Sequence, residues 1–213
     1  MNKIWEFVSV NGWYLLAQEV WVRAVMSLRG WILGRKLRTR GFRVGQKSII
    51  KGLCCMQIGR DFHAGAGLWL EAVTHYNQQS FTPRIVIGDR VHMSRGVHIA
   101  ATNYVVIGDD CLFGSNVTVI DHNHGQYSDP YSSPYDPPSR RPLDHNRVVT
   151  IGRNVWLADG VVVTPGSSIG EGSVVGANTT IRGDIPPFSI VTGNPFVIRK
   201  QYDVSRREWV TTR

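Results

Sequence analysis

The sequence predicts an all-β fold in which short strands wind into a parallel β-helix. Two observations support this prediction: apolar residues recur every six positions over most of the chain, and glycine often follows them. A period of six does not match the 3.6-residue period of an amphipathic α-helix, whereas it suits short strands that stack into apolar ladders. The 22 glycines and 10 prolines also favour many turns over many helices.

The repeat is clearest in the C-terminal half and recurs upstream. Three hexads make one triangular coil, so the fifteen hexads that can be aligned predict about five coils. Glycine takes the position after the apolar residue in eight of them, where a tight corner leaves no room for a side chain. A run of glycine-punctuated loops is the alternative interpretation. The apolar first positions are Ile58, Ala64, Leu70, Ile87, Met93, Ile99, Ile107, Phe113, Val119, Ile151, Leu157, Val163, Ile169, Val175 and Ile181.

We expect three parts: an N-terminal helical segment over residues 1–43, the β-helix over 44–200 and a tail over 201–213. From Trp13 to Ile32 the apolar residues fall near one face of a helix, so this helix should be amphipathic. Charged residues interrupt it, which excludes an 18-residue apolar membrane span, and no signal-peptide cleavage site follows. Tryptophans beside a basic stretch are typical of a helix at a membrane surface. Packing on the protein's own core or on a neighbouring subunit is the alternative.

The formal charge of +8 favours an anionic partner. No nucleic-acid-binding motif is present, so we do not expect nucleic acid as that partner. The cysteines are Cys54, Cys55 and Cys111, an odd number with an adjacent pair, which is a poor disulfide framework. They indicate a reducing compartment and buried structural thiols.

Two segments, VTIGRNVWLADGVVVTPGSSIGEGSVVGANTTI and DIPPFSIVTGNP, resemble the hexapeptide-repeat transferases, which are left-handed parallel β-helix proteins. Within that superfamily they are most similar to galactoside and maltose acetyltransferases and to polysaccharide and lipopolysaccharide O-acetyltransferases. The resemblance covers roughly residues 85–200. It implies a left-handed coil, a homotrimer with active sites between subunits, and acetyl-CoA as donor without a metal. The implied reaction acetylates a sugar hydroxyl, as in a bacterial surface polysaccharide. The Trp-rich basic N-terminal segment suggests a lipid-linked precursor at the cytoplasmic face of the membrane as the acceptor.

The repeat stops after the hexad VIDHNH, and an irregular loop follows over residues 125–147. A long loop that interrupts a regular coil is usually functional, so we expect the chemistry at Asp121, His122 and His124. Histidine suits the role of a base that takes the proton of an attacking hydroxyl, because its pKa lies near neutral pH. The resemblance implies His124 as this base; His122 is the alternative, with Asp121 as the group that orients an imidazole. The family's supporting Asn corresponds to Ser94, for which we expect a substrate contact.

The resemblance also implies a coenzyme A groove at Trp156, Ala158, Gly176, Ala177 and Arg182. Small residues let the pantetheine arm approach the backbone, and an indole offers a flat apolar wall. The ending GNPFVIRK lacks the basic residue that the family places soon after the proline, so Arg199 is expected to take over its contact with phosphate.

Three other functions use the same fold. N-acyl transfer to an amino sugar nucleotide is the nearest of them. A zinc enzyme similar to the γ-class carbonic anhydrases would use His92, His122 and His124, although those enzymes space the later pair differently. A non-enzymatic scaffold would not depend on the histidines at all.

Overall fold

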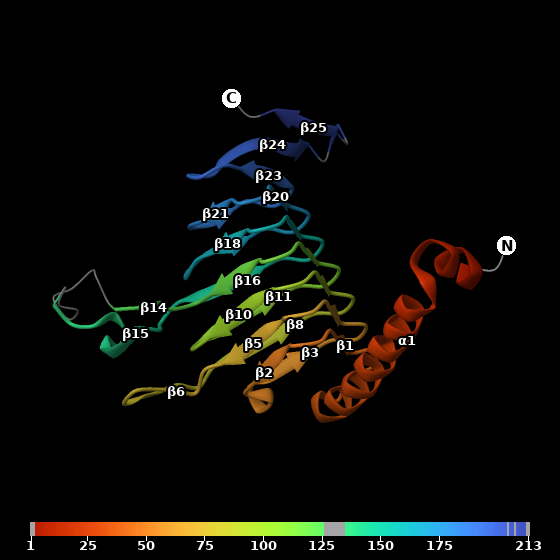
Figure 1. Ribbon diagram of the computed structural model, residues 1–213. Coiled ribbons are helices and arrows are strands. Elements are labelled where there is room, and N and C mark those ends of the chain that lie inside the picture. The colour runs from red at the N-terminus through yellow and green to blue at the C-terminus, as the bar shows by residue number, and fades with distance from the viewer. Residues whose placement is uncertain (1–2, 126–134, 204, 207, 212–213) are drawn as a thin grey trace.

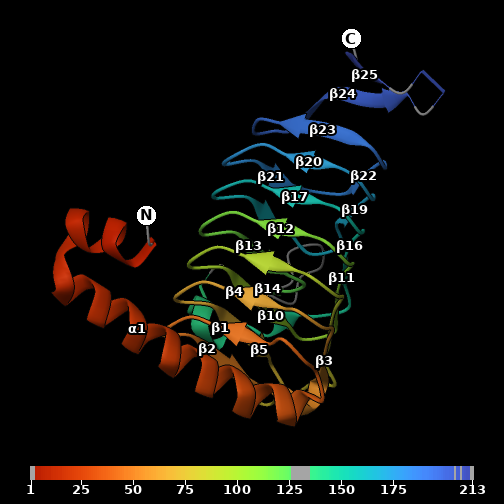
Figure 2. The same ribbon diagram turned by 90° about the vertical axis from the view of Figure 1, so that its right-hand side faces the viewer.

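The computed structural model describes residues 3–125, 135–203, 205–206 and 208–211. Its main body is a column of coils, each contributing one strand to each of three parallel sheets (Figures 1 and 2). The parallel β-helix predicted from the six-residue period is therefore confirmed. Sheet A consists of β1 (Arg43–Val44), β4 (His63–Ala64), β9 (His92–Met93), β12 (Leu112–Phe113), β17 (Trp156–Leu157), β20 (Val174–Val175) and β23 (Ser189–Thr192), followed by β24 (Val197–Asp203) and β25 (Glu208–Thr211).

Sheets B and C complete each coil, with six strands apiece in the described residues. Sheet B consists of β2 (Ile49–Lys51), β5 (Trp69–Ala72), β10 (His98–Ala101), β13 (Thr118–Ile120), β18 (Val162–Val163) and β21 (Thr180–Ile181). Sheet C consists of β3 (Met56–Ile58), β8 (Arg84–Ile87), β11 (Tyr104–Ile107), β16 (Val148–Ile151), β19 (Ser168–Ile169) and β22 (Asp184–Ile185).

The apolar first positions of the hexads form ladders inside the column. On sheet C, for example, Ile87 pairs in register with Ile107, which pairs with Ile151. All three side chains are at most 2% exposed. Equivalent isoleucine, leucine and valine side chains stack in the same way on the other two sheets, so each coil buries its apolar positions against the coils above and below.

Glycine is required at the corners for two reasons. A Cβ atom on Gly152 would lie 2.6 Å from the backbone nitrogen of Glu171 on the next coil, which is too close for any side chain. Gly160 has a φ of 69°, in the left-handed region that glycine adopts without a steric cost. The first case explains the glycines that follow the apolar positions.

The described residues form six complete coils and the start of a seventh, rather than the five that the hexad count predicts. The strands of the column that the hexad count leaves out are β1 and β2 at its start and β22 and β23 at its end. Val44 and Ile50 keep the six-residue spacing, but the 3-10 helix η1 (Leu53–Cys55) lengthens the corner before Ile58. The period is thus lost in the sequence although the ladder continues in space.

Two insertions leave the column at the corner between sheets B and C and project from the same side (Figure 1). The first is a hairpin of β6 (His75–Tyr76) and β7 (Gln79–Ser80). The second is the loop predicted after residue 124, in which β14 (Asn123–His124) pairs with β15 (Leu143–Asp144), joined by a segment that contains η2 (Pro138–Arg140). The sequence predicted the second insertion. The first lies in the gap between the hexad positions Leu70 and Ile87, which was not interpreted as an insertion.

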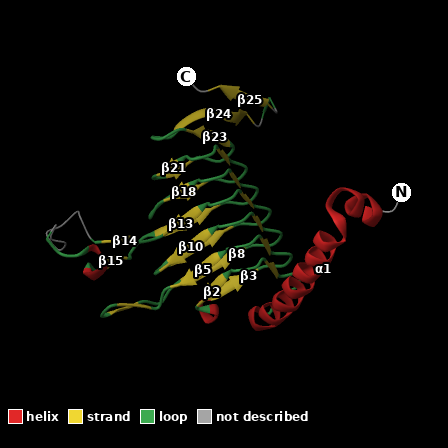
Figure 3. Cartoon of the chain, viewed as in Figure 1, coloured by secondary structure: helices red, strands yellow, loops and turns green. Residues whose placement is uncertain are grey.

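Helix α1 (Lys3–Leu37) crosses the lower end of the column (Figures 2 and 3). Its backbone breaks at Gly12, where φ is 79°. Near the C-terminal end of the helix, Leu33 and Leu37 pack against the core. Gly30 is buried, and a glycine is needed there because a Cβ atom would collide with the backbone of Phe42. This end of α1 therefore closes the bottom of the apolar column.

Over its whole length, α1 does not gather its apolar side chains in one stripe, since its backbone breaks at Gly12; the amphipathic face from Trp13 to Ile32 stays a prediction. Only the last turns are packed on the core. The large side chains farther toward the N-terminus, among them Trp13, Trp21 and Leu28, are more than half exposed. No helix in the described part of the chain is long and apolar enough to cross a membrane.

Candidate active site

Asp121 is the most strongly held polar side chain at the corner where the repeat stops. Its carboxylate is fully buried and accepts hydrogen bonds from the backbone nitrogens of Thr102 (2.9 Å) and Asn103 (2.8 Å) and from the Thr102 hydroxyl (3.1 Å). These donors belong to the preceding coil, so Asp121 ties together two turns of the column. A buried carboxylate is tolerated only when it is hydrogen-bonded in this way.

His122 is the histidine that Asp121 orients. Its Nδ1 lies 2.9 Å from Asp121 Oδ1, and its side chain is 12% exposed. When Nδ1–H donates to the carboxylate, the other ring nitrogen, Nε2, becomes the one that accepts a proton. This carboxylate–imidazole pair is the arrangement that a general base requires.

His124 is oriented by a different partner. Its Nδ1 lies 3.1 Å from the hydroxyl oxygen of Tyr76, a residue of the β6–β7 hairpin, and the two rings meet edge to face at 5.1 Å. The Tyr76 hydroxyl donates to the carbonyl of Ser139 at 2.7 Å, so its oxygen is the acceptor for the His124 ring.

His122 and His124 do not lie on one strand. Strand β13 ends at Ile120, the chain bends at Asp121, and β14 begins at Asn123 in a separate two-stranded sheet. The bend arises because the Asp121 side chain turns inward to its backbone donors while the chain leaves the column. The two histidines therefore have separate supports.

The two insertions hold one another in place. Gln79 of β7 donates its side-chain amide to the carbonyl of Leu143 at 3.2 Å and accepts the backbone N–H of Leu143 at 2.6 Å. Asn77 donates to the Ser139 carbonyl at 3.1 Å. Since Tyr76 also bonds to Ser139, the hairpin fixes the base of the loop that carries His124.

Next to this corner, the outer surface of sheet B carries a set of side chains that the sequence analysis did not single out. Trp69 stacks on His98 with ring centroids 4.6 Å apart, and its indole nitrogen donates to Glu71 at 2.7 Å. Burial lowers the pKa of His98, Glu71 opposes that change, and His122 adds to it. The only signal in the sequence was the alternation of outward residues along β5 and β10.

The residues predicted to form the coenzyme A groove lie together on sheet A and at the corner between sheets A and B. Trp156 of β17 is half-exposed. Ala158 follows it, and Gly176 and Ala177 occupy the equivalent corner one coil higher. A Cβ atom on Gly176 would lie 2.8 Å from the Thr192 side chain, so the corner is narrow there.

The three remaining predicted residues are not gathered at that groove. Arg182 is exposed at the corner between sheets B and C, the corner of the histidines but two coils above them. The side chain of Arg199 lies outside the described part of the structure, although its backbone belongs to β24. Ser94 lies at the corner between sheets A and B, across the width of sheet B from His122.

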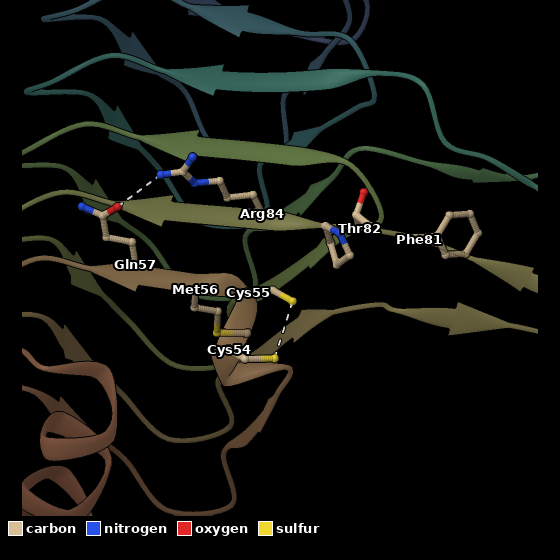
Figure 4. A pocket seen from close by; sticks show the side chains of 8 residues that line it. Cys54, Cys55, Met56, Gln57, Phe81, Thr82 and Arg84 are labelled. Carbon is tan, nitrogen blue, oxygen red and sulfur yellow. Dashed lines mark hydrogen bonds between the residues drawn. The ribbon is translucent and has the colours of Figure 1, made fainter.

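A hollow of about 530 Å³ lies at the corner between sheets B and C in the first two coils. Figure 4 shows the side chains that line it. Arg84 reaches across it to the side-chain oxygen of Gln57 at 3.4 Å. The sulfur atoms of Cys54 and Cys55 lie 3.7 Å apart, and Cys54 is exposed. The prediction of buried thiols is therefore correct only for Cys111, whose burial raises its pKa to about 11.

The histidines proposed for a zinc site do not come together within one chain. His92 projects from sheet A, where it meets His63 edge to face at 5.8 Å, while His122 and His124 lie at the other side of sheet B. Across the residues that the structure describes, no group of three His, Cys, Asp or Glu side chains is arranged to hold a metal ion.

Sequence comparisons identify relatives with the same repeat. Residues 149–183 match the family described as bacterial transferase hexapeptide (six repeats), and residues 104–123 match the hexapeptide repeat of succinyl-transferase. A protein of Escherichia coli (strain K12) named as the lipopolysaccharide biosynthesis O-acetyl transferase WbbJ is 42% identical over 156 residues, which cover 72% of this chain and 76% of that protein.

More distant relatives agree. The galactoside O-acetyltransferase of Escherichia coli (strain K12) is 32% identical over 65% of this chain, a stretch that spans 64% of that enzyme. Among solved structures, a mutant of AntD, an N-acyltransferase from Bacillus cereus, superimposes with a TM-score of 0.61 at 15% identity. It covers 79% of this chain and 84% of its own, which supports the fold. With its stacked hexads and these relatives, the chain belongs to the hexapeptide-repeat transferase family and is an acetyltransferase.

Proposed function

We propose that the protein transfers an acetyl group from acetyl-CoA to a sugar hydroxyl, in a bacterial surface polysaccharide or its lipid-linked precursor. The relatives named as O-acetyltransferases of lipopolysaccharide and galactosides support this acceptor class. The structural observation that carries the proposal is the buried carboxylate of Asp121 on Nδ1 of His122, because it supplies an oriented base at the point where the repeat opens into a loop.

The reaction requires few groups. Nε2 of the base accepts the hydroxyl proton while the sugar oxygen attacks the thioester carbonyl carbon. Backbone N–H groups at a coil edge suit the developing oxyanion. The C–S bond then breaks, and the imidazolium returns the proton to the departing thiolate, so that the products are an acetyl ester and coenzyme A.

The geometry favours His122 as this base and the family position favours His124. His122 has a buried carboxylate partner on its Nδ1, and the ring of His124 contacts the hydroxyl of Tyr76. The carboxylate beside His122 stabilises the imidazolium that forms during the reaction. We therefore place His122 first and keep His124 as the second candidate.

Acetyl-CoA fits the predicted groove in the properties of its residues. Ala158, Gly176 and Ala177 present small side chains along two adjacent coils, and the half-exposed indole of Trp156 flanks them. Such a strip allows an extended arm to reach backbone hydrogen-bonding groups. Arg199 is a proposed contact for the phosphates, and Arg182, which lies at the corner of the histidines, is proposed to reach them from a neighbouring subunit.

The groove and the histidines lie at different corners of one column, which supports an active site shared between copies. Ala158, Gly176 and Ser94 occupy the corner between sheets A and B, while His122 and His124 occupy the corner between sheets B and C. We propose a homotrimer of left-handed columns, the assembly and coil sense that the family implies, in which the groove of one subunit faces the histidines of its neighbour.

We also propose that the enzyme works in the cytoplasm, where acetyl-CoA is available, with α1 against the inner face of the membrane. Supporting this placement, the side chains of Trp13, Trp21 and Trp31 on α1 are exposed. A basic stretch at Arg35 and Lys36 follows them. Exposed tryptophans next to cationic residues favour an anionic lipid surface.

The first test replaces each histidine separately. His122→Ala should lower kcat for acetyl transfer about 10²- to 10⁴-fold because the oriented base is lost, while His124→Ala should lower it less than about 10-fold. The measurement follows coenzyme A release and ester formation with neutral sugars, uronic acids, amino sugars and their nucleotides as acceptors. The exposed residue His75, replaced by Ala, serves as the matched control.

The relative effects of the two substitutions and the acceptors that are used decide between the alternatives. The reverse order of effects would make His124 the base and leave acetyl transfer in place. Transfer confined to amino groups would replace O-acetylation with N-acylation. Unchanged rates in both histidine variants would contradict catalysis at this corner altogether.

A further inference from the structure

Glu71 is fixed on the outer surface of sheet B by two donors from neighbouring positions. Its Oε2 accepts the indole N–H of Trp69 at 2.7 Å, and its Oε1 lies 3.3 Å from the ammonium of Lys51 on the coil below. The Glu71 side chain is still 21% exposed, so its carboxylate is oriented and yet accessible. Each oxygen has a second lone pair that these contacts leave for another donor.

Glu71 and His122 have opposite effects on the pKa of His98. Burial lowers the pKa of His98, the Glu71 carboxylate raises it, and His122 lowers it. Both side chains must therefore lie close enough to influence the same imidazole. Stacking on Trp69 at 4.6 Å holds the ring of His98 in this position.

The strand register explains how these side chains share one surface. Glu71 pairs with Ala100, which pairs with Ile120 on β13. Side chains alternate along a strand, so Ile120 points outward while Val119 and Asp121 are buried. His122 lies two residues after Ile120, beyond the bend at Asp121. In this row, only the methyl group of Ala100 separates Glu71 from Ile120. The small side chain leaves room for a ligand next to the corner between sheets B and C, where His122 lies.

We propose that this surface, formed by Glu71, His98 and Ala100 and leading to His122, is the acceptor subsite, and that Glu71 selects uncharged sugars; the proposal rests on the acetyl transfer proposed above. The Glu71 carboxylate accepts hydrogen bonds from two neighbouring hydroxyl groups of a pyranose ring. A third hydroxyl of the same ring then meets the base. An acceptor that carries its own carboxylate is repelled by Glu71.

A carboxylate is the right group for this selection because it only accepts hydrogen bonds. Two vicinal hydroxyls present two donors at the spacing of two carboxylate oxygens, and hydrogen bonds to a charged acceptor are the stronger kind. Since Lys51 and Trp69 hold the carboxylate already, little side-chain freedom is lost when the sugar binds.

The test compares Glu71→Gln with wild-type enzyme on methyl β-D-galactopyranoside, methyl α-D-glucopyranoside and methyl β-D-glucuronide. KM for the better neutral glycoside should rise about 10- to 100-fold in the variant, the effect of losing a hydrogen bond to a charged group. KM for acetyl-CoA and the rate of acetyl-CoA hydrolysis without acceptor should stay unchanged. The preference for a neutral glycoside over the glucuronide should shrink, because repulsion of the second carboxylate is removed.

Two further variants separate binding from folding. Glu171→Gln makes the same chemical change at an exposed carboxylate that pairs with Arg153 at 2.7 Å, far from sheet B, and should leave every constant unchanged. Trp69→Phe keeps an aromatic ring against His98 but removes the N–H that holds Glu71. It should therefore raise KM for the neutral glycoside by less than Glu71→Gln does.

Failure of the acceptor subsite and failure of the proposed acetyl transfer give different results. If wild-type enzyme transfers no acetyl group to any sugar, the proposed function fails and the subsite with it. If wild-type transfer is robust and Glu71→Gln leaves both KM and the neutral-sugar preference intact, the subsite alone is wrong. A uniform loss of kcat together with a lower melting temperature would assign Glu71 a structural role instead, and would also overturn the subsite.

Discussion

At the scale of single residues, the side chain of Asp121 at the corner after β13 determines which histidine is oriented by a carboxylate. Asp121 is adjacent to His122 in the sequence and turns into the column, where Thr102 and Asn103 of the coil below supply its hydrogen bonds. The sequence indicated a carboxylate that orients an imidazole. It did not indicate which imidazole, because that choice depends on the bend at Asp121 and on the unforeseen contact of His124 with Tyr76.

Asp121→Asn should lower kcat about 10²- to 10⁴-fold with little change in KM for acetyl-CoA. The amide has one nitrogen donor where the carboxylate has an acceptor, so it cannot satisfy the backbone N–H groups and also accept from His122. The ring of His122 then loses the contact that makes Nε2 the basic nitrogen. Steady-state kinetics, with thermal unfolding measured alongside, would test this prediction.

Asp109→Asn is the matched control for that experiment. Asp109 also accepts a backbone N–H from another coil, that of Asp89 at 2.7 Å, but it lies at the corner between sheets C and A. Its replacement should change stability without changing kcat. Equal losses of kcat in the two variants would show that Asp121 acts only through the fold.

At the scale of elements, the two insertions form one unit. The β6–β7 hairpin leaves the column two coils below the loop of β14 and β15, and Gln79 and Tyr76 bond to that loop. The loop was predictable because its five prolines stop the period. The gap between the hexad positions Leu70 and Ile87 marks the place of the hairpin, but only the fold brings the hairpin beneath the loop.

The two ends of helix α1 lie in different environments. Its last turns cap the core through Leu33 and Leu37, and its exposed apolar side chains lie farther toward the N-terminus. Removing the whole helix would uncover the column, so a test of membrane contact must leave the last turns in place. Point substitutions on the exposed part meet that condition.

Trp13→Ser combined with Trp21→Ser should lower binding to phosphatidylglycerol vesicles at least about 10-fold, because two exposed indoles no longer enter the lipid interface. These residues are 61% and 71% exposed. Vesicle co-sedimentation is the measurement, with phosphatidylcholine vesicles for comparison and Leu112→Ser, an exposed apolar residue of sheet A, as control. Equal binding by the double variant would argue against the membrane, and a change in oligomer mass would point to a neighbouring subunit.

At the scale of the whole molecule, the separation of the groove from the histidines makes a prediction about mixed oligomers. One variant carries His122→Ala and His124→Ala, and another carries Ala177→Trp, which fills the groove. Each alone should be inactive. A trimer that contains both has one interface with an intact groove facing intact histidines, so purified mixed trimers should regain about one third of wild-type activity.

Two affinity tags allow the mixed species to be isolated, and sedimentation equilibrium gives the number of chains. Regained activity requires that the two halves of a site come from different subunits. Mixed oligomers that stay inactive, or a protein that sediments as a single chain, would contradict the shared site.

The sequence by itself determined the column. A period of six with apolar first positions leaves few ways to bury those side chains, and the ladders from Ile87 to Ile151 follow from it directly. It also determined the family and the place of the loop, since a break in a regular repeat is visible without coordinates. The first two strands, β1 and β2, were not predicted because η1 changes the spacing before Ile58.

Only the tertiary structure decided which side chains meet. Tyr76 and His124 are 48 residues apart, and Trp69 and His98 are separated by a hairpin whose length sets their register. Contacts between coils depend on the number of residues at each corner, which no local pattern encodes. For the same reason the separation of Ala158 and Gly176 from the histidines became evident only in space, where strands two residues long place each corner on its own edge of the column.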